Sequence, residues 1–162
     1  MYKAYLISFW LLISLIPVYS GEKVNWVPFN EGLEKAAKEK KYILIDFYAD
    51  WCNICTVMDN TTFKEPTILA ELSKNYVSIK INTESSESIT WQGKKISKKA
   101  FAGELGVYGL PTYIFMNAKA EIIGSYSAYA DKDLMLNMLQ YVSSGARERQ
   151  ETLQDFLKKQ PK

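Results

Sequence analysis

Residues 42–55 read YILIDFYADWCNIC, and this stretch decides the fold. Its first half, Tyr42 to Tyr48, is an apolar run broken by one acid, Asp46. Such a run predicts a central strand that is buried on both faces of a sheet. Its second half carries Cys52 and Cys55 where a helix is expected to begin, around Trp51 or Cys52. The stretch therefore predicts a buried strand that leads into a Cys-x-x-Cys pair at a helix start.

Helices and strands alternate around this stretch. A helix is expected over 26–40, because apolar residues recur there at helical spacing. Downstream the pattern predicts a helix ending before Pro66, a short helix over 67–73 and a strand over 76–81. The polar segment over 83–97 is either a hairpin or a loop. A helix over 98–105, strands over 112–116 and 121–126, and a helix over 131–143 are expected after it. This order predicts an α/β fold with a parallel portion and a terminal antiparallel hairpin.

The first twenty residues have the features of an export signal. Lys3 is followed by an uncharged, mostly apolar run over 4–18, and residues 18–20 suit a cleavage site. The run is shorter than the roughly 20 apolar residues that a membrane span needs, although an uncleaved N-terminal anchor is the alternative. We expect a signal peptide over 1–20, one domain over 21–145 and a charged extension over 146–162.

The charged extension carries one narrow apolar face, formed by Leu153, Phe156 and Leu157. Two interpretations are open: a solvated helix or a site for a partner. The net charge of the whole chain is +2, which gives no electrostatic case for nucleic acid as a partner. The chain has no histidine, so acid–base catalysis and metal binding by histidine are excluded.

The two cysteines are the only ones in the chain. A helix start stabilises a thiolate on Cys52 by about 0.3–2 kcal/mol. A structural staple is one alternative, but closing so short a loop contributes only about 2 kcal/mol. A zinc site needs four ligands, and no further Cys or His completes the set. An incidental thiol pair fits poorly with the place beside Trp51 before a helix. The pattern favours a redox dithiol, with no metal or organic cofactor expected.

Three segments resemble the thioredoxin superfamily. Residues 45–55 resemble its active-site strand and helix start, residues 107–112 its cis-proline segment, and residues 80–82 the end of the strand between them. Residues 48–52 and 62–66 are similar to the C-terminal domain of the membrane thiol:disulfide interchange protein, and the insert over 90–97 to thioredoxins of sulfur-oxidation systems. The resemblance implies a thioredoxin fold: a central mixed sheet flanked by helices, with an insert before the cis-proline strand and a C-terminal helical extension.

The resemblance also implies roles for the polar residues of the site. Cys52 would attack a substrate disulfide, and Cys55, expected to be the more buried thiol, would resolve the mixed disulfide. Asp46 would assist deprotonation of Cys55; otherwise its carboxylate reaches solvent or a backbone amide. Lys80 either pairs with Asp46 or is an exposed lysine at a strand end. Asp59 either modulates Cys55 or lies on a solvated helix face.

Substrate contacts are expected from Trp51, Leu110 and a cis Pro111, although Trp51 is alternatively a half-buried packing residue. The implied function is an exported, periplasmic thiol:disulfide oxidoreductase that reduces protein disulfides and receives electrons from a membrane partner of the interchange type. Two rival functions stay open. One is a disulfide oxidase or isomerase, and the other is a binding module or chaperone without turnover.

Overall fold

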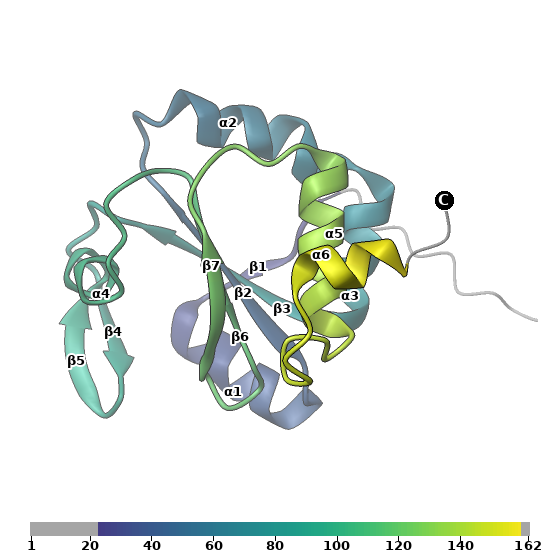
Figure 1. Cartoon of the computed structure of the whole chain (residues 1–162). Coiled ribbons are helices and arrows are strands. Elements are labelled where there is room, and N and C mark those ends of the chain that lie inside the picture. The colour runs from purple at the N-terminus through teal and green to yellow at the C-terminus, as the bar shows by residue number, and fades with distance from the viewer. Residues whose placement is uncertain (1–22, 160–162) are drawn as a thin grey trace, which may run out of the picture.

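The computed structural model describes residues 23–159 and is built on a five-stranded sheet. The strand order is β1-β3-β2-β6-β7 (Figure 1). β1 and β2 run parallel to β3, while β6 runs antiparallel to both β2 and β7. The bounds are β1 Trp26–Val27, β2 Tyr42–Tyr48, β3 Tyr76–Asn82, β6 Thr112–Met116 and β7 Ile122–Tyr126. The expected mixed sheet, with its parallel portion and terminal hairpin, is confirmed.

Strand β2 lies at the centre of the sheet, as its apolar run predicts. Ile43, Leu44, Ile45 and Phe47 are fully buried, because neighbouring strands flank β2 and helices cover both faces. Alternate side chains of a strand point to opposite faces. Leu44 accordingly joins one apolar core, and its neighbours Ile43 and Ile45 join the other. Asp46, between Ile45 and Phe47, shares the face of Leu44.

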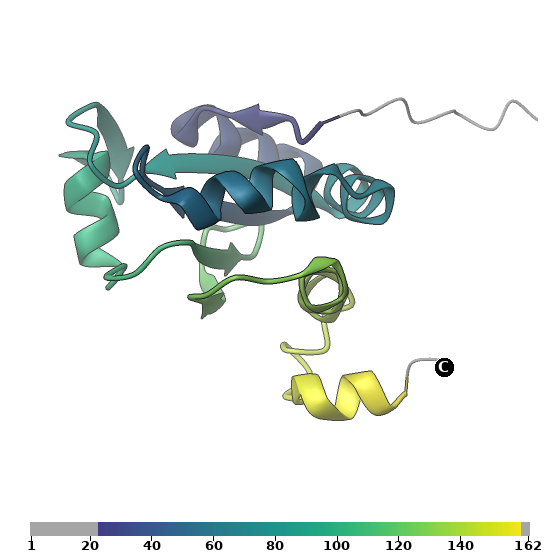
Figure 2. The same cartoon turned by 90° about the horizontal axis from the view of Figure 1, so that it is seen from above.

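Helices form a layer on each face of the sheet (Figure 2). α1 (Phe29–Glu39) and α4 (Lys98–Glu104) supply side chains to one core, with Phe29 and Phe101 in edge-on contact. α2 (Asn53–Asn60), the 3-10 turn η1 (Thr62–Lys64), α3 (Pro66–Asn75) and α5 (Lys132–Ser143) supply the other. The site-bearing helix α2 therefore lies over the same face as Asp46.

The polar insert forms a hairpin, which settles the choice between hairpin and loop. β4 (Ser88–Trp91) pairs antiparallel with β5 (Lys94–Ser97). Gln92 and Gly93 at the turn both have positive φ, as a tight hairpin turn of this kind requires. Trp91 packs edge-on against Phe101 of α4. The insert is thus an extension of the core on the α1 and α4 face.

The expected helix start at Trp26 is wrong. Trp26 and Val27 form β1, whose partners in β3 are Ser78 and Ile79, and the helix begins only at Phe29. The physical reason is Pro28, which biases the preceding residue toward extended backbone. An aromatic and a β-branched residue then suit a short edge strand better than a helix.

The C-terminal extension contains helix α6 (Leu153–Lys158), which packs on α5 on the side away from the sheet (Figure 2). Phe156 is buried there and meets the ring of Tyr141 at 5.7 Å. Both expectations for this apolar face are therefore wrong for Phe156, because the domain itself covers it. The expected signal peptide over 1–20 lies outside the described residues. Within residues 23–159, every helix is too short or too polar to cross a membrane.

Candidate active site

Cys52 and Cys55 are joined in a disulfide at the start of α2, with their Cα atoms 5.3 Å apart. Cys52 is the N-cap residue of the helix, so the expected helix start is confirmed. Its Sγ accepts a hydrogen bond of 3.2 Å from the backbone N–H of Cys55. The same N–H and the positive end of the helix dipole would stabilise a negative charge on Cys52 after reduction.

The expected difference in burial between the two cysteines is wrong for this disulfide state. Cys52 is 3% exposed and Cys55 is 4% exposed. The bond holds the two sulfurs together, so the surrounding chain covers both equally. What distinguishes the residues is their place on α2, since only Cys52 caps the helix and accepts the amide hydrogen bond.

Asp46 is the buried acid of the site. Its side chain is 2% exposed, and Oδ1 has no hydrogen-bond partner among the described residues. Burial raises the pKa of Asp46 to about 7, although the nearby Lys80 ammonium opposes this shift. Oδ2 lies 3.3 Å from Lys80 Nζ. The alternative of a solvated carboxylate is wrong. Asp46 therefore combines a pKa raised by burial with one oxygen that has no partner among the described residues.

Lys80 joins Asp46 to the helix that carries the cysteines. Its ammonium pairs with both Asp46 and Asp59, which decides between the two interpretations of Lys80 in favour of pairing with Asp46. It also lies 4.9 Å from the ring centre of Tyr48, where the π-face favours a cation. Asp59 stands one helical turn beyond Cys55, on the same side of α2. This chain of charges therefore runs from β2 to the helix face below Cys55.

Pro111 follows a cis peptide bond, as the resemblance implies. In the β2–β6 register Phe47 is paired with Thr112, so Pro111 lies level with the end of β2 from which the chain continues to Cys52. Thr112 Oγ1 lies 2.7 Å from the carbonyl oxygen of Gly109 and 2.8 Å from Ser127 Oγ. These hydrogen bonds fix the loop before Pro111. Leu110, half-buried, stands at the edge of the same loop.

Apolar side chains are exposed at this end of the sheet. Trp51 is 64% exposed, so the alternative of a half-buried packing residue is wrong. Tyr108, in the loop before Pro111, is 92% exposed, and Ile54 and Val57 of α2 are also exposed. Sequence reasoning missed these last three residues. Ile54 and Val57 could have been noticed from the sequence. They are three residues apart on α2, and each comes directly before a buried position, Cys55 or Met58.

Tyr113 is a second residue that sequence reasoning missed. It is fully buried on β6, directly opposite Asp46 in the register, and its hydroxyl has no hydrogen-bond partner among the described residues. Burial, reinforced by the charge of Asp46, raises the pKa of Tyr113. No sequence signal marks it, because a tyrosine in an apolar strand is usual. Among the described residues, no three Cys, His, Asp or Glu side chains are grouped as metal ligands.

Comparison with known proteins places this chain in a family. A family model described as a thioredoxin-like domain matches residues 29–143. The chain belongs to the thioredoxin-like family. Its fold and its Cys-x-x-Cys disulfide are those of a thiol:disulfide oxidoreductase.

Curated relatives of this thioredoxin-like chain include thiol:disulfide interchange proteins. It is 30% identical over 99 residues to DsbD of Photorhabdus laumondii, over 61% of this chain and 15% of that protein. It is 28% identical over 113 residues to DsbD of Vibrio vulnificus, over 70% of this chain and 17% of that protein. The thioredoxin-like chain therefore spans only 15–17% of the length of these relatives.

Solved structures share the fold. A thioredoxin from Thermus thermophilus has a TM-score of 0.65 at 21% identity, covering 80% of this chain and 94% of that one. The C-terminal domain of DsbD from Neisseria meningitidis has a TM-score of 0.53 at 20% identity, covering 68% of this chain and 90% of that one. These likenesses establish the thioredoxin fold predicted from the sequence.

Proposed function

We propose that this protein is an exported thiol:disulfide oxidoreductase that reduces protein disulfides through Cys52 and Cys55. The observation that carries the proposal is the Cys52–Cys55 disulfide at the N-terminus of α2, over the face of the sheet that holds Asp46. A disulfide-bonded pair is the oxidised product of such a reaction. The reduced pair is the form that acts on a substrate.

The reaction has two exchange steps. The Cys52 thiolate attacks one sulfur of a substrate disulfide, a new S–S bond forms, and the other substrate sulfur leaves as a thiolate that takes up a proton. The Cys55 thiol then loses its proton and attacks Cys52 Sγ. This second attack releases the remaining substrate thiol and closes the Cys52–Cys55 disulfide. Two electrons pass from the dithiol to the substrate.

Asp46 is proposed to accept the proton of Cys55. Its free Oδ1 and its pKa of about 7 suit a carboxylate that takes a proton and returns it near neutral pH. Lys80 and Asp59 modulate that pKa by their charges. Trp51, Leu110 and Pro111 are proposed to receive an extended segment of the substrate, because exposed apolar groups and loop backbone lie together at this end of the sheet.

The resemblance and the relatives support a proposal for the location and the electron donor. Residues 1–20 are proposed to direct export to the periplasm, or to act as an N-terminal anchor there. The oxidised pair is proposed to be re-reduced by a membrane protein of the thiol:disulfide interchange type, which supplies two electrons by the same exchange chemistry. Disulfide-bonded proteins of that compartment are the proposed substrates.

An insulin-reduction assay tests the proposal. With a small dithiol as electron source, the wild-type protein is expected to accelerate insulin precipitation, and Cys52→Ser is expected to abolish the acceleration. Asp46→Asn is expected to slow turnover, whereas Asp50→Asn, which changes an exposed acid two residues before Cys52, serves as the matched control. Wild-type protein that gives no acceleration would favour a binding module or chaperone instead.

The direction of the reaction needs a separate measurement, the reduction potential of the Cys52–Cys55 pair. A reductase is expected near the value of about −270 mV typical of thioredoxin, and an oxidase near about −120 mV. Equilibration with a glutathione buffer, read by alkylation of the free thiols, gives this number. A potential at the oxidising end would replace the reductase proposal with the oxidase alternative.

A further inference from the structure

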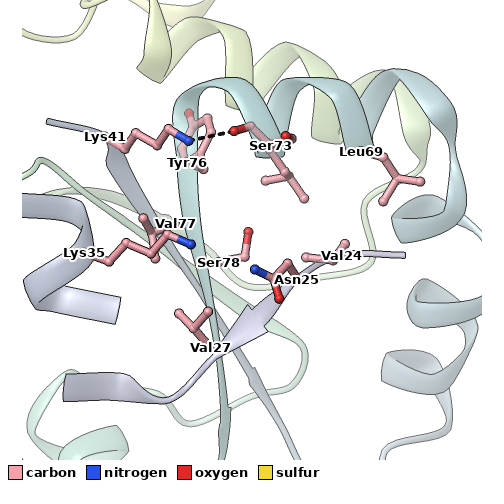
Figure 3. Close-up of a pocket in the computed structure, with 11 residues that line it drawn as sticks. Val24, Asn25, Val27, Lys35, Lys41, Leu69, Ser73, Tyr76, Val77 and Ser78 are labelled. Carbon is pink, nitrogen blue, oxygen red and sulfur yellow. Dashed lines mark hydrogen bonds between the residues drawn. The ribbon is translucent and has the colours of Figure 1, made fainter. Parts of the chain in front are cut away.

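A cavity lies at the opposite end of the sheet from the cysteines. It has a volume of about 280 Å³ and opens between β1, the start of β3, α1 and α3 (Figure 3). In the parallel register Tyr42 is paired with Tyr76, and Tyr48 with Asn82. The cavity is at the Tyr76 end, whereas Cys52 follows the Tyr48 end, roughly 20 Å away at about 3.3 Å per residue. It is therefore separate from the exchange site.

The cavity exists because the edge strand is short. β1 has two residues, which pair with Ser78 and Ile79 of β3. No strand of the described sheet covers the first two residues of β3, Tyr76 and Val77, on this side. The chain before β1 turns away, with the N–H of Trp26 donating to the carbonyl oxygen of Val24 at 3.1 Å. The start of β3 thus forms the floor of an open space.

Hydrogen-bond donors converge on this space. Figure 3 shows the side chains of Lys35, Asn25 and Ser78 directed into it from α1, from the segment before β1 and from β3. Ser78 is 5% exposed, and its hydroxyl makes no hydrogen bond to the described residues. The hydroxyl oxygen is not fully enclosed, so it is open to the cavity and can donate a hydrogen bond to a ligand that enters it.

The charge of Lys35 is not compensated locally. Within residues 23–159 no carboxylate lies within 4 Å of its ammonium, although Glu31 and Glu39 are one turn away on the same helix. Lys41, on the cavity wall, is different. Its Nζ donates to the carbonyl oxygen of Ser73 at 2.8 Å and pairs with Glu39 at 3.2 Å. The cavity therefore presents one free cation beside two neutral donors.

The remaining lining consists of Ser73, Tyr76 and an apolar group formed by Val24, Val27, Leu69, Leu72 and Val77. We propose that this cavity binds a small organic anion, with a carboxylate or phosphate head on Lys35, Ser78 and Asn25 and a short apolar body against the valine and leucine side chains. The head group satisfies the donors, and the body removes apolar surface from water. A cation or a neutral alcohol of the same size lacks the charge that Lys35 requires.

Titration of the purified protein with hexanoate tests the proposal. At low ionic strength, hexanoate is expected to bind saturably and to shift the amide NMR signals of residues 24–27 and 76–78. Hexylammonium and hexanol, of matched length, are expected to bind at least about tenfold more weakly. Inorganic phosphate and phenyl phosphate, titrated in parallel, show whether the site prefers a phosphate head. Absence of saturable binding by every anion at tens of millimolar would overturn the proposal.

Two variants locate the binding. Lys35→Met keeps the aliphatic stem and removes the charge, and Ser78→Ala removes the buried hydroxyl; each is expected to weaken hexanoate binding by about tenfold or more. Lys38→Met, at an exposed position of the same helix, is the matched control and is expected to leave binding unchanged. Equal effects of Lys35→Met and Lys38→Met would show non-specific attraction and contradict the proposal. The NMR spectra of all three variants report directly whether each has folded.

Discussion

Asp46 of β2 and Tyr113 of β6 are directly paired on adjacent antiparallel strands, and each carries a buried oxygen without a hydrogen-bond partner among residues 23–159. One is Asp46 Oδ1 and the other is the Tyr113 hydroxyl. Buried polar atoms are nearly always paired, so two unpaired oxygens on neighbouring residues of adjacent strands are unusual. They lie on the sheet face that α2 and its cysteines cover.

Replacing Tyr113 by phenylalanine removes one of these orphans. Because the hydroxyl makes no bond, Tyr113→Phe is expected to leave the free energy of unfolding unchanged or to raise it by up to about 1–3 kcal/mol. Tyr76→Phe is the matched control, since the Tyr76 hydroxyl donates to the carbonyl oxygen of Leu139 at 2.5 Å. That variant is expected to lose about 1 kcal/mol. Urea denaturation of both oxidised variants measures the difference, and a larger loss for Tyr113→Phe would show a partner for its hydroxyl.

The pH dependence of stability should report the raised pKa of Asp46. Its pKa is about 7 in the folded protein, against 3.8 for an unburied aspartate. Between these values the folded state binds the extra proton, so this group makes the protein less stable as pH rises from about 4 to about 7. Asp46→Asn removes that loss. The variant is expected to match the wild type near pH 4 and to exceed it by a few kcal/mol at pH 8.

Urea denaturation of the oxidised proteins at both pH values checks this expectation, and the difference between variant and wild type cancels the other titrating groups. Asp50→Asn, at an exposed position, is expected to show no such pH-dependent difference. A stability difference between Asp46→Asn and wild type that is the same at pH 4 and pH 8 would mean that folding does not raise the pKa of Asp46.

Lys80 holds the pKa of Asp46 down, against the effect of burial. Lys80→Met is therefore expected to raise the pKa of Asp46 above about 7 and to shift the pH profile of mixed-disulfide resolution toward higher pH. Stopped-flow measurement of that step across pH 6–9 tests this. Lys98→Met, which breaks a pair with Glu87 on the insert side, is the matched control. Identical profiles for Lys80→Met and the wild type would remove Lys80 from the site.

The packing of α6 on α5 is expected to depend on Phe156. This side chain is buried against Tyr141, so Phe156→Ala is expected to cost up to about 3 kcal/mol or to release α6 from the domain. Leu157→Ala, at an exposed neighbouring position, is expected to cost less than about 0.5 kcal/mol. Denaturation and limited proteolysis of the tail separate the two variants. Equal protection of the tail in both would contradict this packing.

Much of the fold could be predicted from the sequence because its signals are local. The apolar run of β2, the helix start at Cys52 and the cap at Asp131 each depend on a few neighbouring residues. β1 was missed because two residues are too short for a period, and its strand conformation depends on pairing with Ser78 and Ile79 of β3. The burial of Phe156 was also missed because it depends on tertiary packing. The side chain is covered by α5, and the local sequence around Phe156 does not reveal that contact.

The candidate site was predictable where the residues have a motif. Cys52, Cys55 and Pro111 carry the resemblance, and Asp46 stands out as an acid in an apolar strand. The sequence left open whether Lys80 pairs with Asp46 and whether Asp59 belongs to the site. Both contacts depend on the register of β2 with β3 and on the position of α2, which the sequence alone does not give. Tyr113 and the cavity at Lys35 had no sequence signal at all, since both arise from side chains that the fold brings together.

Trapping of mixed disulfides tests the central claim, that Cys52 attacks the substrate and Cys55 resolves the adduct. Both single variants, Cys52→Ser and Cys55→Ser, are incubated in reduced form with a disulfide-containing protein and analysed on a non-reducing gel. The account predicts that Cys55→Ser accumulates a covalent adduct, because no resolving thiol is left, and that Cys52→Ser forms none. An adduct with Cys52→Ser and none with Cys55→Ser would contradict the assigned roles.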